Sequence, residues 1–164
     1  MRYLFAILIL MITFGKVQAQ SSTTVSGTID ISACMGLTIT NLTGVVSFND
    51  ASDYMSGITI TNAATIAVKS NVNWLIDISA QSAYFQAMSS GASTNMPASV
   101  LQIRRNGTTS YITMSTNSQT LKSGNKGDEN TTGNSFNTDV SINPGFGYNA
   151  GSYNIGVLFT LSQQ

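Results

Sequence analysis

Side chains able to carry out covalent chemistry are few in this sequence. Among 164 residues there is no histidine, one cysteine, Cys34, and one glutamate, Glu129. The absence of histidine excludes Ser-His-Asp and Cys-His nucleophiles, histidine-ligated zinc and histidine acid–base catalysis. Cys34 has no base to activate it. We therefore predict no catalytic residue and no enzyme activity.

Carboxylates and amides are the remaining candidates for catalysis or metal binding. Glycosidases need two carboxyl groups facing each other across a cleft, whereas Glu129 adjoins Asp128 in a polar loop, and Asp77 and Asp139 face outward from predicted strands. Calcium takes six to eight oxygen ligands from groups of this kind. Two turns gather such groups without the spacing of an EF-hand: Asn49, Asp50 and Asp53, and Asn125, Asp128, Glu129 and Asn130. We interpret both as turns that cap their own backbone, and we predict no metal and no cofactor.

Aromatic residues in the predicted loops raise the possibility of sugar binding. Phe146 and Tyr148 share one loop, and Tyr84 follows the strand that contains Trp74. Exposed aromatic rings combine an apolar face with a polar edge and suit carbohydrate recognition, so a carbohydrate-binding module is the alternative function. Trp74 shares a strand face with Ile76, which places it in the core. We expect the loop aromatics to cover the ends of the fold.

The first nineteen residues have the pattern of an export signal. Arg2 precedes an apolar run from Leu4 to Phe14, and Val17-Gln18-Ala19 supplies the small residues that a signal peptidase reads. The run is too short to cross roughly 30 Å of hydrocarbon as a helix. We predict a signal peptide at 1–19, one domain at 20–164, and a location in the periplasm, on the cell surface or outside the cell.

The charge of the exported chain limits the classes of partner it can bind, and its cysteine content limits the covalent links it can form. Without Arg2 and Lys16, five of the seven basic residues remain against seven acidic ones, which gives a net charge of −2. Nucleic-acid binding needs clustered lysines and arginines, so we predict none. A lone cysteine in an exported protein is either a small buried hydrophobe or an exposed thiol. The segment before Cys34 resembles a lipoprotein box, but polar residues separate it from the apolar run.

Alternation of apolar and polar residues, the signature of half-buried strands, dominates the rest of the chain. The clearest segments have one wholly apolar face: Tyr153 to Leu161, Trp74 to Ala80, Phe136 to Ile142 and Ala64 to Val68. Weaker strands are predicted at Val25 to Ala33, Leu37 to Leu42, Val45 to Phe48 and Gly57 to Ile60. Two polar segments, Ser89 to Pro97 and Asn117 to Ser135, read as long loops. No apolar stripe of helical period runs through a full helix, although a turn at Ser82 to Met88 fits.

The most specific local prediction is a hairpin from Val100 to Met114. Asn106-Gly107 separates two alternating runs, and this pair favours a type I′ turn, which needs positive φ at both central residues. Many short strands without helices indicate an all-β fold. We predict a single-domain, immunoglobulin-like antiparallel β-sandwich. A small outer-membrane β-barrel is a further alternative, but membrane strands need about 9–11 residues, and only the last strand is long enough.

Two segments resemble known families of exported sandwich proteins. Gly57, Val68 and Trp74-Leu75-Ile76, followed by the closing strand from Ala150-Gly151-Ser152-Tyr153 to Leu161, resemble small WxL-like surface proteins. The closing strand is also similar to the ends of spore coat U and chaperone–usher fimbrial subunits. The resemblance implies an immunoglobulin-like fold and a structural or adhesive surface role, and it transfers no catalytic residue. Fimbrial subunits usually carry a disulfide, which one cysteine cannot form.

The two terminal strands suggest how such a domain assembles. Terminal strands can insert into a neighbour's sheet by main-chain pairing, so we expect self-association or pairing with other surface proteins, with a glycan as a further candidate partner. The alternative is that 25–33 is the first strand of its own sandwich. The candidate strand-pairing residues are Val25, Ile29, Ile31, Tyr153, Ile155, Val157 and Phe159.

Overall fold

The computed structural model describes residues 26, 28–40 and 45–164. The chain divides into two units, Met1–Ile31 and Ser32–Gln164. In the first unit the described residues belong to no helix or strand, and Ile29 and Ile31 are exposed. The predicted signal peptide, residues 1–19, lies outside the described residues. None of the helices in the described part of the chain is both long enough and apolar enough to cross a bilayer.

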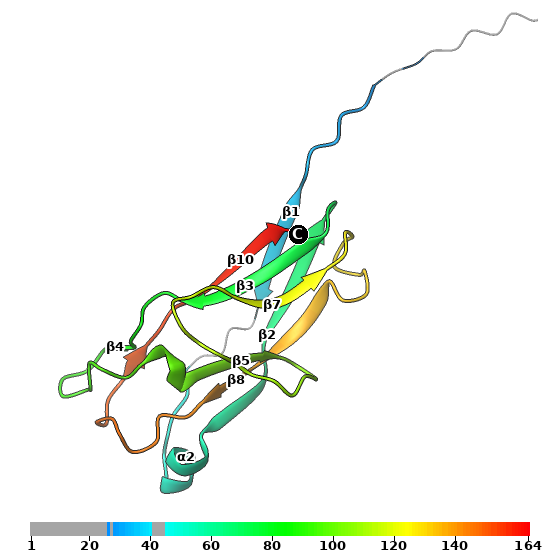
Figure 1. Cartoon of the computed structure of the whole chain (residues 1–164). Coiled ribbons are helices and arrows are strands. Elements are labelled where there is room, and N and C mark those ends of the chain that lie inside the picture. Colours follow the sequence, from blue (N-terminus) through cyan, green and yellow to red (C-terminus); the bar gives the residue numbers. More distant parts are fainter. Residues whose placement is uncertain (1–25, 27, 41–44) are drawn as a thin grey trace, which may run out of the picture. The chain divides into compact units, whose positions relative to one another are not determined.

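The second unit consists of antiparallel sheets (Figure 1). The larger sheet has the order β1 (Met35–Thr40), β2 (Ile58–Ser70), β8 (Ser135–Ile142), β5 (Leu101–Arg105) and β6 (Ile112–Thr113). The second sheet has the order β10 (Val157–Gln163), β3 (Trp74–Ala80) and β7 (Gln119–Gly124). The remaining elements are the pair β4 (Gln86–Ala87) and β9 (Tyr153–Asn154), the helix α2 (Ala51–Ser56) and the 3₁₀ turn η1 (Ala98–Val100).

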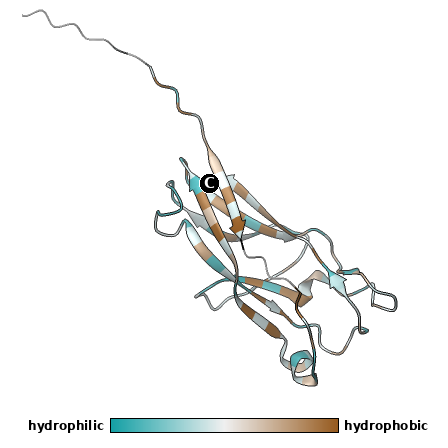
Figure 2. Cartoon of the chain, turned by 180° about the vertical axis from the view of Figure 1, so that it is seen from behind, coloured by the Kyte–Doolittle hydropathy of each residue, from teal (hydrophilic) through white to brown (hydrophobic). Residues whose placement is uncertain are grey.

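The core lies between the two larger sheets. Ile66 and Val68 of β2 pack with Trp74 and Ile76 of β3, and all four side chains are fully buried. Figure 2 shows apolar and polar residues alternating along the strands, as expected when one face of each sheet is buried. The predicted all-β antiparallel sandwich is therefore confirmed.

The strongest strand predictions are confirmed, both in the position of each strand and in which of its faces is buried. β3 matches the predicted segment from Trp74 to Ala80, and its side chains alternate between buried and half-buried along the whole strand. β8 contains the segment from Phe136 to Ile142. Two predicted strands, Gly57 to Ile60 and Ala64 to Val68, form the single strand β2, whose register shifts between Ile60 and Ala64.

The closing strand is interrupted where the sequence pattern is continuous. It forms β9 and β10, with Ile155 and Gly156 between them. Gln81 explains the break, because its backbone N–H donates to the Gly156 carbonyl at 2.9 Å and its side chain occupies the space where a Cβ of Gly156 would lie. The apolar face still continues through the interruption.

Several weaker predictions are wrong. Residues 45–48 form no strand, and neither do the described residues of the segment from Val25 to Ala33. No helical turn occurs at 82–88, where β4 lies instead. β7 lies inside the predicted loop of residues 117–135, and its pairing with β3 was not visible in the pattern because only Leu121 is apolar. The short helix α2 was also missed, although Asp50 and Asp53 form the capping box that begins it.

The predicted hairpin is present, but its turn is not type I′. Gly107 has a φ of 81°, whereas Asn106 has no positive φ. The reason is that β8 holds Asn106, whose backbone N–H donates to the Asn137 carbonyl at 2.8 Å and whose side-chain amide donates to Asp139 at 2.9 Å. The returning strand β6 therefore begins only at Ile112.

Candidate functional site

One side of the sandwich is formed by β10 and by the half of β2 that β1 does not cover. β10 is the last strand of its sheet, and no strand among the described residues pairs with its other edge. In the facing sheet, β1 covers β2 only from Thr65 to Ser70. Before Thr65, β2 pairs with β8 at Ile58–Ile60 and again at Ala64.

An open groove of about 890 Å³ is lined by both of these strands. Its apolar lining comes from the facing sheet, from the closing segment of the chain and from the loop before α2. The main contributors are Ile60, Leu101, Ile103, Val140, Ile142, Val46, Phe48, Tyr153, Ile155, Val157 and Phe159. Most of these side chains are only half-buried, so the groove leaves apolar surface in contact with water.

The groove has what is needed to hold an extended chain. A free strand edge presents unpaired N–H and C=O groups that template pairing with another strand. The apolar lining supplies contacts for alternate side chains of that strand, which is how added strands gain specificity. Natural sheets protect such an edge with charges, bulges or a covering segment, and no other strand in the described part of the chain covers the edge of β10.

The predicted strand-pairing residues separate into two groups. Tyr153, Ile155, Val157 and Phe159 all line the groove and are half-buried. Ile29 and Ile31 are 85% and 81% exposed and lie in no strand. Val25 lies outside the described residues.

Tyr153 is fixed in place by its hydroxyl group. The hydroxyl accepts the backbone N–H of Ser93 at 3.0 Å and donates to the carbonyl of Asn149. The ring can therefore form part of the groove wall without leaving the phenolic oxygen unsatisfied. Pairing of β9 with β4 also holds this end of the wall, since Ala87 lies opposite Tyr153.

An aromatic group at the edge of the groove was missed by the sequence patterns. Tyr54 of α2 packs against Phe48 with ring centroids 5.2 Å apart, and it stacks on Phe146 at 5.3 Å. Phe146 and Tyr84 remain 69% and 54% exposed, so the expectation that the loop aromatics cover the ends holds for the half-buried Tyr148 and not for these two. The signal available in the sequence was the capping box at Asp50, which places Tyr54 on a helical turn.

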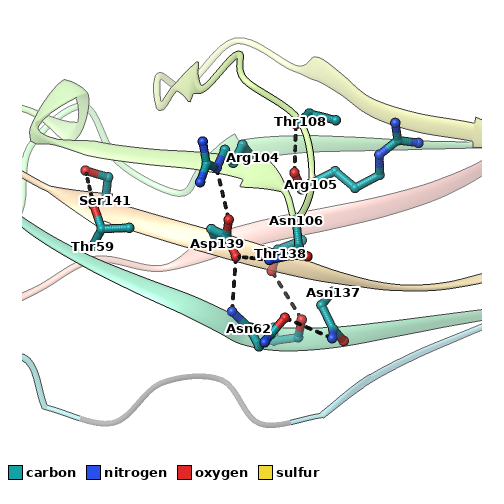
Figure 3. A network of polar contacts seen from close by, with 11 residues as sticks. Thr59, Asn62, Arg104, Arg105, Asn106, Thr108, Asn137, Thr138, Asp139 and Ser141 are labelled. Atoms are coloured by element: carbon teal, nitrogen blue, oxygen red, sulfur yellow. Dashed lines mark hydrogen bonds and ion pairs between the residues drawn. The ribbon is translucent and has the colours of Figure 1, made fainter.

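A buried carboxylate anchors the bulge of β2 to the neighbouring strands (Figure 3). Asp139 is fully buried, although its position on the outward face of β8 had predicted exposure. It accepts hydrogen bonds from Arg104 Nε at 2.9 Å, from Asn106 at 2.9 Å and from the backbone of Asn62 at 3.1 Å. Asn62 has a φ of 54°, a conformation that asparagine tolerates better than most residues.

Opposing effects set the pKa of Asp139. Burial disfavours the charged form and by itself would raise the pKa. Hydrogen bonds from Asn106, Asn62 and Arg104, together with the positive charge of Arg104, outweigh burial and lower the pKa below its usual range. Asp139 is thus an ionised structural anchor and has no open space in which to act on a substrate.

The two turns considered for calcium use their oxygens locally. Asp50 accepts the backbone N–H groups of Ser52 at 2.9 Å and Asp53 at 3.1 Å. Asp128 accepts those of Asn130 at 3.0 Å and Thr131 at 3.1 Å. Glu129 pairs with Lys69 at 2.9 Å. Within the described ranges no three His, Cys, Asp or Glu side chains are grouped to hold a metal ion.

Cys34 is an exposed free thiol rather than a buried hydrophobe. Its backbone N–H donates to the side-chain oxygen of Asn71 at 2.7 Å, and the side-chain nitrogen of Asn71 donates to the carbonyl of Ser32 at 2.7 Å. These bonds attach the chain that precedes β1 to the turn between β2 and β3.

No protein-family model matches the sequence, and the comparison with curated proteins found no match. Among solved structures, a chain from the structure of a chaperone–usher pilus is 10% identical, with a TM-score of 0.42. The alignment covers 90% of this chain and 97% of that chain. The function is therefore inferred from the geometry of the groove.

Proposed function

We propose that this protein is an exported, non-catalytic structural subunit of a surface assembly, in which a segment of one copy pairs with β10 of another. The observation that supports this most directly is the open apolar groove beside the free edge of β10. Natural sandwiches protect such edges with charge, bulges or covering segments. An edge left open beside a groove lined by apolar side chains suits a surface that a partner strand completes.

The proposed partner strand is the segment of residues 25–33 from another copy. Its apolar side chains Ile29 and Ile31 are two residues apart, as are Val157 and Phe159 on the groove wall. Side chains on one strand face repeat about every 6.6–7 Å, so the two series can stay in contact along the groove. Burying one isoleucine contributes roughly 1.5–3 kcal/mol, which offsets part of the cost of ordering the segment.

The course of β1 favours a second copy as the acceptor. β1 runs antiparallel to β2, with Met35 opposite Ser70 and Thr40 opposite Thr65. The chain that enters β1 is attached to Asn71, just beyond the Ser70 end of β2. The groove lies at the other half of β2, where Ile60 contributes to its lining. Ser32, where this attachment is made, thus lies near the end of β2 remote from the groove.

Deletion of residues 20–33 tests the proposal. Protein that begins at residue 20 should form concentration-dependent multimers in sedimentation experiments and filaments or chains by electron microscopy. The deletion variant should remain folded, by circular dichroism, and should stay monomeric. A control that lacks only residues 20–24 keeps the alternating segment and should still assemble.

Two outcomes would contradict this function. A deletion variant that unfolds would show that residues 20–33 belong to the protein's own sandwich. A deletion variant that assembles as well as the longer protein would show that the contacts between copies lie elsewhere.

A further inference from the structure

A second, smaller cleft of about 360 Å³ lies between the β5–β6 hairpin and β7. Arg104, Arg105 and Lys122 line it, together with hydroxyl side chains that include Thr108, Ser110 and Thr120. Only five basic residues occur after position 20. Three of the five therefore gather in one cleft of a protein that is otherwise poor in charge.

Two of these cations lack a carboxylate partner. Arg104 is paired with the buried Asp139 at 2.9 Å, whereas neither Arg105 nor Lys122 forms an ion pair within the described residues. Lys122 is half-buried, donates to the carbonyl of Gly133 and lies 4.7 Å from the ring centre of Phe136. Its pKa is lowered by burial and, in addition, by the charge of Arg105. Two like charges thus share the cleft, and no carboxylate among the described residues pairs with either of them.

The chemistry of the lining selects a ligand class. The planar guanidinium of Arg105 can donate two parallel hydrogen bonds to a carboxylate, and Lys122 supplies a second positive charge. The hydroxyl groups of Thr108 and Thr120 already donate to the Arg105 carbonyl and to Asp77, so their remaining capacity is to accept hydrogen bonds. An anion such as sulfate has no hydrogen to donate to these oxygens, whereas the hydroxyl groups of a sugar do. A volume of about 360 Å³ also falls in the range of small-molecule sites, about 300–1,000 Å³.

We propose that this cleft binds the carboxylate of an acidic saccharide of the uronic-acid type, with Arg105 and Lys122 as the anion-binding pair. The sugar hydroxyl groups then meet the hydroxyl side chains of the hairpin and of β7. β6 and β7 are the edge strands opposite β1 and β10 in their sheets. The site therefore stays accessible when the groove is filled, and it does not depend on strand pairing between copies.

Calorimetric titration of the purified protein that begins at residue 20 with a galacturonic acid trisaccharide tests the site, with the neutral galactose trisaccharide as the matched ligand. The acidic sugar should bind, the neutral sugar should not, and affinity should fall as salt is raised. Arg105→Gln should weaken binding at least tenfold. Lys69→Gln, which removes an exposed lysine outside the cleft, should leave binding unchanged.

The outcomes are decisive in either direction. Equal affinity of the Arg105→Gln variant, binding of the neutral sugar, or equally tight binding of acetate or sulfate would each overturn the proposal. If Arg105→Gln does not fold, amide chemical shifts of the unmodified protein provide the second test. Shifts confined to residues 104–112 and 119–123 on addition of the acidic sugar support the site, and their absence or a different location overturns it.

Discussion

At the residue scale, Asp139 links more separate elements through its side-chain hydrogen bonds than any other charged residue in the described part of the chain. It joins the bulge of β2, the end of β5 and the hairpin turn to the centre of β8 (Figure 3). Buried charges are tolerated when they are paired and fully hydrogen-bonded. Asp139 meets this condition, because each of its carboxylate oxygens accepts at least one hydrogen bond.

Replacing Asp139 by asparagine should destabilise the domain by about 3 kcal/mol at neutral pH, since removal of one partner leaves the charge of Arg104 uncompensated. Urea unfolding followed by tryptophan fluorescence measures this difference. Asp77→Asn is the matched control, because Asp77 is less buried and bonds only to the hydroxyl of Thr120. A loss below 0.5 kcal/mol in Asp139→Asn would contradict the anchoring role.

The stabilisation by Asp139 should depend on pH in a defined direction. The pKa of Asp139 is lower in the folded protein than its usual value of 3.8, so below pH 4 the unfolded chain binds more protons at this site. The contribution is complete above the unfolded pKa and is lost as pH falls through the folded pKa. The difference in unfolding free energy between the native protein and Asp139→Asn should therefore shrink below pH 4 and stay constant from pH 5 to 7.

Gly124 is a second position at which the packing of the core requires a particular residue type. A Cβ at this position would lie 2.1 Å from Cζ2 of the buried Trp74. Gly124→Ala should destabilise the domain by about 1–3 kcal/mol through overpacking, measured by thermal unfolding. Gly36→Ala is the control, because its Cβ would have no neighbour closer than 4.0 Å. Equal stability of the two variants would show that the Trp74 ring can move aside.

At the scale of elements, the two edge strands of the smaller sheet differ in a way that favours pairing at one of them. β7 carries the inward-directed Lys122, which packs near the rings of Trp74 and Phe136. An inward-pointing charge on an edge strand discourages pairing with another chain. β10 carries no charged residue, and its inner face lines the groove. Strand addition is therefore expected at β10 and not at β7.

Adjacent positions on β10 allow a matched test of this expectation. Val157→Lys places a charge in the groove and should weaken assembly at least tenfold, measured by sedimentation. Leu158→Lys changes the neighbouring side chain, which is 49% exposed and does not line the groove, and should assemble normally. The opposite ranking of the two variants would place the interface on the outer face of the sheet.

At the scale of the whole molecule, the truncated domain should accept its missing strand as a separate peptide. A peptide of residues 22–34 should raise the melting temperature of the variant that lacks residues 20–33. A ligand that binds only the folded state stabilises it by about 2.7 kcal/mol at a concentration of one hundred times its Kd. The same peptide with Ile29→Asp and Ile31→Asp should have no effect, because these charges cannot enter an apolar groove. A shift of equal size with both peptides would contradict strand addition.

The groove could be anticipated in part. The inward face of the closing strand was readable because Tyr153, Ile155, Val157 and Phe159 alternate with mostly polar or small residues. The residues that line the rest of the groove could not be predicted from the sequence, since Ile60, Val140 and Leu101 reach the groove through pairings between distant segments. The same limit hid β7, which pairs with β3 through its backbone while presenting mainly polar side chains. The pairing of two strands through backbone hydrogen bonds cannot be predicted from the pattern of apolar and polar side chains.

The scarcity of catalytic side chains, the all-β class and the inward face of each strong strand followed from the amino-acid sequence, because alternation is a local property of an extended backbone. The order of the strands, and with it the position of β10 at a sheet edge, became known from the fold, because strand order depends on contacts between distant residues. The fold also decided the environment of each charge. Asp139 occupies an outward-facing position, yet Asn62 of β2 and both Arg104 and Asn106 of the β5–β6 hairpin converge on it. Arg105 and Lys122 lie seventeen positions apart in the sequence, and the fold brings them together in one cleft.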